Sequence, residues 1–210
     1  MDLTLTLPAR LYLLAYRPDR RRLAQRSDLG LMLRAAALTD LLQRGLLRDE
    51  RGTVRLGDPA PTRLDPLLAG VREQITDSRP RGWERWVRTG NHAAPRAVRE
   101  QLVENGTLEL EQYRVMGLLP RLRPAPSDPE PRERLLADFN AALTDPLPQV
   151  EPGAAALVAL ADAGRLGHLL SLGQRRSQRD RLRELAIIAG PAPSALRHAI
   201  RARHSVQSGG

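Results

Sequence analysis

The sequence predicts a mainly α-helical protein: a single globular helical domain with one or two short β-hairpins, one of them protruding. The chain has 210 residues, enough for one domain with its own core. Leu, Ala and Arg dominate, while aromatic residues make up only 3%, and this composition favours helices. A helix–glycine–strand–turn–strand pattern also occurs twice, at 41–56 and 102–119, and indicates two hairpins that each follow a helix.

Apolar periodicity and the placement of Gly and Pro predict ten helices. Ser27 and Asp28 are expected to cap the second one. Gly45, Gly106 and Gly190 mark helix ends that need a left-handed residue. The expected helices are 8–16, 29–45, 63–78, 82–88, 95–105, 131–144, 153–163, 165–173, 177–189 and 193–203.

Pro-rich joints at 124–131 and 146–152 separate the later segments. The domain is expected to span 1–203, followed by a flexible tail at 204–210. The N-terminal stretch lacks a basic leader, and Pro8 and Arg10 interrupt its apolar run, so it predicts neither a signal peptide nor a membrane span.

The charge pattern favours an anionic partner. The net charge is +9, and all 33 basic residues are Arg. A protein this basic attracts polyanions, either nucleic acid or the anionic surface of a membrane. The scarcity of aromatic side chains disfavours a single-strand nucleic-acid binder, which normally stacks bases on such rings.

No motif of a known catalytic or cofactor site is present, so the protein is expected not to be an enzyme and to need no cofactor. The chain has no Cys, and its four His residues are scattered without a metal-ligand spacing, so no metal site is expected. A lone His such as His168 is expected to be structural or solvated.

One charged residue lies on the apolar face of the helix LMLRAAALTDLLQR, at 31–44. Arg34 aligns with Leu38 and Leu41, opposite the polar face that carries Asp40. Three explanations are open: Arg34 pairs with a buried carboxylate, extends along its methylenes to the surface, or points into a pocket that receives an anion. The third suits Arg, because its planar fork matches phosphate oxygens.

This helix and several other segments resemble the Golgi phosphoprotein 3 family, the GPP34 domain. The family has a leucine-rich first helix, here Leu7 to Tyr16, and then a Gly-Leu-Arg-small-small-x-Leu-x-acidic-Leu-x-x-Arg-Gly helix, which residues 33–45 follow from its Leu onward. The Lys-free composition is typical of a bacterial member. The other matching segments, in the family's order, are TRLDPLLAGV, ERWVR, RAVRE, LVENGTL, RLRPAP, PRERLLADF and AALVALADAGRLGHLL.

The resemblance implies a mostly helical globule with a protruding hairpin. It also implies that a basic pocket binds phosphatidylinositol 4-phosphate or a related anionic lipid. Family members are peripheral membrane adaptors that hold glycosyltransferases in Golgi membranes through the cytoplasmic tails of those enzymes. The implied location is therefore cytoplasmic and peripheral to a membrane, while the oligomeric state stays open.

The resemblance also assigns residues to the lipid pocket. Arg34 matches the family's first pocket arginine, and Arg96 and Arg99 match a second pair whose spacing puts both on one helix face. If the register is set from LVENG without a gap, this second match is lost. The family has a pocket Trp shortly before the first arginine, whereas residues 22–26 here read RLAQR.

The second hairpin is expected to touch the membrane. Val115, Met116, Leu118 and Leu119 form its apolar tip, which would either pack on the core or enter the bilayer as a small wedge. Arg114, Arg121 and Arg123 flank this tip, as expected beside anionic headgroups.

Two other functions remain. The repeated helix–hairpin unit resembles a winged helix, so a nucleic-acid-binding protein is the alternative, although no segment concentrates the basic residues as a recognition helix would, and no nucleic acid is expected. The missing Trp also leaves open a purely protein-binding scaffold that has lost lipid recognition.

Overall fold

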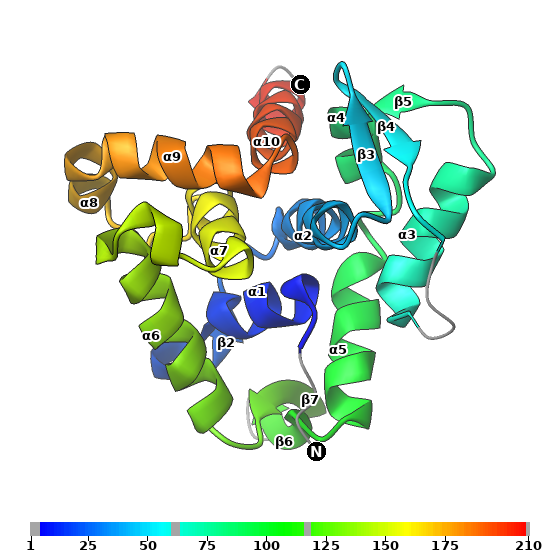
Figure 1. Ribbon diagram of the computed structural model, residues 1–210. Helices are drawn as coiled ribbons and strands as arrows, with labels where there is room; N and C mark the ends of the chain where they lie inside the picture. Colours follow the sequence, from blue (N-terminus) through cyan, green and yellow to red (C-terminus); the bar gives the residue numbers. More distant parts are fainter. Residues whose placement is uncertain (1–4, 60–63, 116–118, 209–210) are drawn as a thin grey trace.

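The computed structural model describes residues 5–59, 64–115 and 119–208, which fold into one mainly helical domain with a few short antiparallel strands (Figure 1). The mainly helical prediction is confirmed. The helices are α1 (Leu7–Ala15), α2 (Leu29–Gln43), α3 (Pro66–Thr76), α4 (Trp83–Arg88), α5 (Ala94–Glu104), α6 (Glu130–Thr144), α7 (Pro152–Ala163), α8 (Leu172–Ser177), α9 (Arg179–Ala189) and α10 (Ala192–Ser208), with 3-10 turns at Pro18–Arg20 and Leu147–Gln149.

Helix α2 is the centre of the fold. It packs against α1, α3, α4, α5, α7 and α10, and Figure 1 views it end on, surrounded by these helices. Every residue from Leu29 to Leu41 is buried. A helix that is apolar on nearly all sides has to be covered on all sides, and each fully buried Leu contributes about 1.5–3 kcal/mol. Helices α1 and α7 are buried almost as completely.

The strands form three small antiparallel sheets. The repeated pattern is confirmed, because α2 leads into a hairpin of β3 (Leu47–Glu50) and β4 (Thr53–Leu56), and α5 leads into a hairpin of β6 and β7. In Figure 1 the second hairpin lies at the edge of the domain, beyond α1 and between α5 and α6. The remaining strands are β1 (Tyr16–Arg17), β2 (Arg22–Leu23), β5 (Arg81–Gly82), β6 (Leu108–Val115) and β7 (Leu119–Pro126).

Two predicted helix boundaries are wrong. The helix expected over 165–173 is absent, and α8 begins only at Leu172. A capping box sets this start, since Ser171 Oγ accepts the Gln174 backbone N–H at 3.2 Å while the Gln174 side chain accepts the Ser171 N–H at 2.9 Å. Helix α10 does not end at 203 but continues through Ser208.

The expected cap of α2 is confirmed in its position but not in its hydrogen bond. Asp28 occupies the cap position but makes no capping hydrogen bond. Its carboxylate instead pairs with Arg203, and it accepts a hydrogen bond from His204 Nε2 at 3.1 Å, which fastens α10 to the start of α2. The expected left-handed glycines are confirmed, with φ of 73° at Gly45, 76° at Gly106 and 81° at Gly190.

Candidate anion-binding site around Arg34

The Arg34 side chain is buried between α2 and the end of α4, with only 2% of its surface exposed. It forms no ion pair with any described residue. Its Nε and Nη2 both donate to the backbone oxygen of Trp86, over 3.4 and 3.3 Å. This oxygen lies in the last turn of α4, where the helix dipole is negative. Arg34 therefore neither pairs with a carboxylate nor extends to the surface.

The third nitrogen of this guanidinium, Nη1, is left open. It has no hydrogen-bond partner among the described residues, and it is not among the atoms that the protein fully encloses. It faces Gly90, whose φ is +66° and whose added Cβ would lie 3.5 Å from Nη1. Burial lowers the pKa of Arg34 to about 10, so the group keeps its charge at neutral pH. Nη1 can thus donate to an anion.

A second buried polar group, on the residue whose backbone oxygen Arg34 contacts, also lacks a partner among the described residues. The indole Nε1 of Trp86 is fully enclosed and has no hydrogen-bond acceptor among the described residues. Most buried polar groups in proteins are satisfied, and one that is not calls for an explanation. Arg34 Nη1 and Trp86 Nε1 are therefore two donors without a hydrogen-bonded acceptor among the described residues.

The two other predicted arginines lie on α5 but differ in environment. Arg96 is 76% exposed at its side chain and pairs with Glu100 at 2.7 Å. Arg99 is partly buried, and its charge acts on the Tyr12 hydroxyl of α1. Among the described residues, neither Arg96 nor Arg99 shares a hydrogen-bond partner with Arg34. The structure therefore brings the three residues to two adjacent helices but does not join their guanidinium groups.

Arg99 has a basic neighbour that the sequence analysis did not select. Burial raises the pKa of Tyr12 to about 12, and the charges of Arg99 and Arg26 oppose that rise. Both guanidinium groups are thus close enough to the hydroxyl to affect its pKa. Arg26 belongs to the stretch where the family has its Trp, so an arginine now occupies this neighbourhood.

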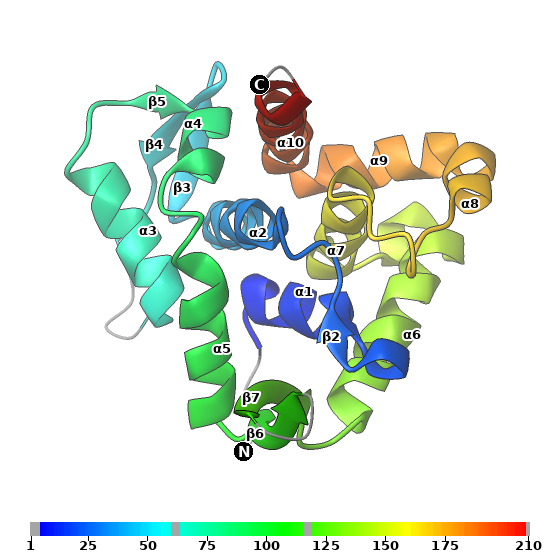
Figure 2. The same ribbon diagram turned by 180° about the vertical axis from the view of Figure 1, so that it is seen from behind.

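The stretch at 22–26, which the resemblance aligns with the family's pocket Trp, contributes to a basic recess of about 620 Å³. It lies around β2, which Figure 2 shows beside α1. Gln25 has a φ of +47°, and its Nε2 donates to the backbone oxygen of Arg165 at 3.1 Å. The dense basic stretch PDRRRLAQR at 18–26 was the sequence signal for this recess. Its lining residues are Arg17, Arg22, Leu23, Ala24, Gln25, Arg26, Ser27, Gly167 and His168.

Helix α10 contributes to another recess, of about 470 Å³, on the side of α4. Arg203 Nη2 donates to Asn91 Oδ1 at 2.8 Å, and Asn91 follows directly after Gly90. The sequence analysis missed this arrangement because Arg203 lies more than a hundred residues from its partner. The recess is lined by Leu31, Arg85, Arg88, Thr89, Asn91, His92, Ala199, Ala202, Arg203 and Val206.

A comparison with protein-family models identifies the family of the chain. The family model of Golgi phosphoprotein 3 (GPP34) matches residues 7–203, nearly the whole sequence. The chain belongs to the GPP34 family. Members of this family are adaptors rather than enzymes. A comparison with curated proteins finds no match.

Two further observations concern this GPP34 protein. Within the described ranges, none of the helices combines the length and apolar character needed to span a bilayer. The described residues also contain no group of His, Asp and Glu that could hold a metal ion.

The predicted membrane-contacting tip lies mostly outside the described residues. Met116 and Leu118 fall in the undescribed segment. The backbones of Val115 and Leu119 pair at the end of the β6–β7 ladder. In the middle of this hairpin, Arg123 Nη2 pairs with Glu111 at 2.9 Å across the two strands.

Proposed function

We propose that this GPP34 protein is a peripheral membrane adaptor that binds phosphatidylinositol 4-phosphate or a related anionic lipid. Arg34, Arg96 and Arg99 bind the headgroup, and the apolar hairpin tip at 115–119 contacts the bilayer. The observation that carries the proposal is the open Nη1 of Arg34, a charged donor without an acceptor in the described part of the chain, on a helix that matches the family motif.

The local charge distribution supports an anionic ligand. The charges of Arg99 and Arg26 both act on the Tyr12 hydroxyl of α1, and the recess around β2 is lined by Arg26 and two further arginines. Arg96 would have to exchange Glu100 for the headgroup. That pair is exposed, and solvent screens exposed ion pairs, so the exchange costs little.

Electrostatic attraction and apolar contact both contribute to the proposed membrane binding. Each basic residue near an anionic surface contributes roughly 1 kcal/mol, and the whole protein carries a net charge of +9. Binding is therefore expected to be reversible and to weaken as salt is raised, because salt screens exposed charges. The arginines around Arg34 provide selectivity for a phosphorylated headgroup over other anionic lipids.

Vesicle flotation tests the headgroup site. The wild-type protein should float with phosphatidylcholine vesicles that contain phosphatidylinositol 4-phosphate and stay unbound with phosphatidylcholine alone. The Arg96→Gln, Arg99→Gln double variant should lose roughly tenfold in affinity. The control is Arg79→Gln with Arg176→Gln, which removes the same charge from two exposed arginines. Equal binding by the two double variants would refute the headgroup site.

The adaptor role has its own test. As the family resemblance implies, the proposed protein partners are the cytoplasmic tails of membrane glycosyltransferases. A binding assay between the purified protein and synthetic tail peptides should show saturable binding that persists in the double variant. Binding to tails without any binding to vesicles would instead favour the pure scaffold.

The structure weighs against the winged-helix alternative. A recognition helix must be exposed to enter a groove of DNA, whereas α2, which leads into the first hairpin, is buried from Leu29 to Leu41. A gel-shift titration at physiological salt should therefore show no retardation of duplex DNA.

A further inference from the structure

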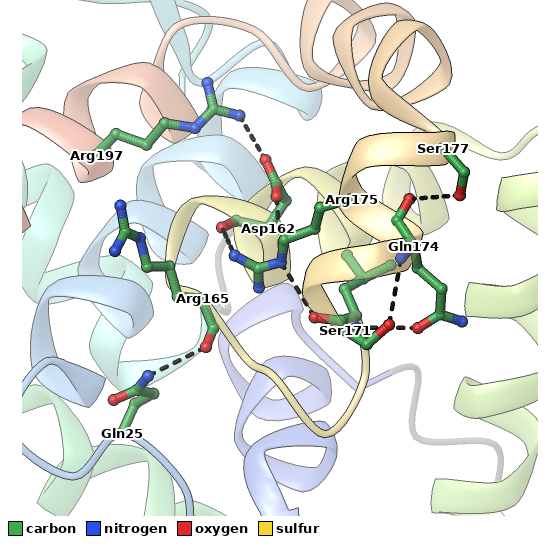
Figure 3. Close-up of polar contacts among 9 residues, drawn as sticks. Gln25, Asp162, Arg165, Ser171, Gln174, Arg175, Ser177 and Arg197 are labelled. Carbon is green, nitrogen blue, oxygen red and sulfur yellow. Dashed lines mark hydrogen bonds and ion pairs between the residues drawn. The ribbon is translucent and has the colours of Figure 1, made fainter.

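A basic recess lies at the C-terminal end of α7, and none of Arg34, Arg96 and Arg99 lines it. It has a volume of about 420 Å³ and is formed by the end of α7, the turn that follows, α8 and α10. Its lining residues are Asp162, Ala163, Arg165, Arg175, Arg197, Ile200, Arg201 and His204. Four arginines and one carboxylate thus line the recess, and Figure 3 shows Arg165, Arg175 and Arg197 together with Asp162.

Asp162 orients two of these arginines. Its Oδ2 accepts a hydrogen bond from Arg197 Nη2 at 3.0 Å, and its Oδ1 lies 3.7 Å from Arg175 Nε. The carboxylate therefore holds the two groups near each other, but a single negative charge cannot neutralise both. Holding like charges together leaves a positive field that a bound anion would offset.

Arg175 is the enclosed member of the cluster. Its Nε donates to the backbone oxygen of Leu170 at 3.1 Å, and its Nη1 donates to that of Asp162 at 3.3 Å. Its Nη2 is fully enclosed and has no hydrogen-bond partner among the described residues. Burial lowers the pKa of Arg175, and the nearby charges of Arg165 and Arg197 lower it further, against the effect of Asp162.

Arg165 is held at the rim by its backbone. Its φ of +53° is unusual for a residue with a side chain. Its N–H donates to the Asp162 oxygen at 3.1 Å, and its own oxygen accepts from Gln25. The preceding Gly164 leaves no room for a side chain, because a Cβ there would lie 2.5 Å from Met32. The turn is therefore fixed in the shape that presents Arg165.

Two of the four arginines have free side chains. Arg165 and Arg201 are exposed, and neither side chain has a hydrogen bond or ion pair with another described residue. Arg197, which is paired with Asp162, is 40% exposed and keeps part of its guanidinium accessible. The exposed guanidinium groups of Arg165 and Arg201 can therefore donate hydrogen bonds to a ligand. Arg175 is more enclosed and has one nitrogen without an acceptor among the described residues.

We propose that this recess is a second anion site, which binds a phosphomonoester group. A phosphate has several acceptor oxygens and two negative charges near neutral pH, and these match forked guanidinium donors better than one carboxylate does. The apolar wall formed by Ala163 and Ile200 leaves room for a small carbon skeleton. The site goes beyond the proposed headgroup function because none of its residues belongs to the Arg34, Arg96 and Arg99 set.

The phosphate could come from a free metabolite or from a lipid headgroup, so the experiment has two arms. The first titrates inositol 1,4-bisphosphate into the full-length protein by calorimetry. The second measures flotation with phosphatidylcholine vesicles that contain phosphatidylinositol 4-phosphate. A loss of calorimetric binding in the recess variant with flotation unchanged identifies a soluble ligand, and a loss of flotation in that variant identifies a membrane source.

The matched variants are two double substitutions of exposed arginines. Arg165→Asn with Arg201→Gln changes the site, and Asn is chosen because it tolerates a positive φ. Arg176→Gln with Arg179→Gln is the control, which removes the same charge from exposed residues that do not line the recess. The site variant should lose tenfold or more in affinity for the bound probe, whereas the control should change roughly twofold or less.

The outcomes separate this proposal from the headgroup function. Replacing Arg96 and Arg99 should leave binding at the recess unchanged. In NMR spectra recorded during the titration, the changes in backbone amide chemical shift should concentrate at 162–175 and 197–204. Equal losses in the two double variants would overturn the proposal, and so would the absence of binding in both arms. An Arg175→Lys variant, which keeps the charge but not the fork, should show an intermediate loss.

Discussion

Helix α2 contains two buried charged side chains, Asp40 and Arg34, which differ in how completely they are paired. Asp40 is 6% exposed, and both of its oxygens have donors. Oδ2 accepts the backbone N–H of Leu7 at 2.6 Å, and Oδ1 accepts from Arg44 Nε. The carboxylate therefore caps the first turn of α1 and joins the two central helices.

Arg34 is buried more deeply but is paired less well. It has only the Trp86 oxygen, over 3.3–3.4 Å, and no carboxylate among the described residues. A buried charge with complete partners serves the fold, whereas one with incomplete partners adds little to stability. The difference suggests that Asp40 is retained for folding and Arg34 for binding.

Replacing Asp40 should give the largest effect. Asp40→Leu leaves the Leu7 N–H without its acceptor and Arg44 without its partner. The free energy of unfolding should fall by about 3 kcal/mol. Denaturant titration measures it, with Asp138→Leu, an exposed carboxylate, as control. A fall below about 1 kcal/mol would mean that Asp40 is not the structural member of the comparison.

A glycine tests the packing beside Arg34. A Cβ on Gly30 would lie 2.1 Å from the backbone oxygen of Asn91, so Gly30→Ala must push α2 away from the turn that contains Gly90. The expected loss is about 2 kcal/mol in the free energy of unfolding. Gly70→Ala on α3 is the matched control, because nothing lies within 4 Å of its Cβ, and it should stabilise the protein slightly. Similar values for both variants would contradict the close approach.

Replacing Arg34 should separate stability from binding. Arg34→Met removes the buried charge and keeps an apolar chain of similar length, so the free energy of unfolding should change by less than about 1 kcal/mol. Vesicle binding should fall roughly tenfold, because the open donor is gone. A loss of stability as large as that of Asp40→Leu, with binding unchanged, would make Arg34 a structural residue too. Arg79→Met controls for the lost charge.

Much of the fold could be predicted because it depends on local signals. The nearly continuous apolar character of α2 and α7 marks central helices, and the glycines at 45 and 106 mark the ends that lead into hairpins. The start of α8 was missed because apolar residues at 166–170 imitate a helix. Leu166 and Leu170 are buried in a turn instead, and the helix begins only after the Ser171 cap.

The candidate sites were harder to predict because their partners are distant in sequence. Periodicity selected Arg34, but only the fold shows that its partner is a backbone oxygen at Trp86. The arginines of the recess around Asp162 come from the turn after α7, from α8 and from α10, and none stands out in a sequence with 33 basic residues. The capping role of Asp40 was equally hidden, since Leu7 lies on another helix.

His168 is a half-buried ionisable group that is treated in a third way, since its surroundings favour the neutral ring. Its Nε2 donates to the Leu14 oxygen at 2.9 Å. Burial lowers its pKa below the usual 6.5, the Leu14 hydrogen bond and the charge of Asp19 oppose the shift, and Arg17 and Arg132 add to it. The unfolded chain therefore takes up a proton more readily than the folded one, so this stability is present above about pH 6.5 and is lost as the pH falls.

The effect of His168 on stability should be the smallest of the series. His168→Gln can still donate to Leu14 but cannot titrate, so it should flatten the fall in stability below pH 6.5 by less than about 1 kcal/mol. Unfolding midpoints measured on both sides of that pH give the slope. His198→Gln is the control, because that ring is 56% exposed. If both variants keep the wild-type slope, burial does not lower the pKa of His168. The comparison of ionisable groups then rests on Asp40 and Arg34 alone.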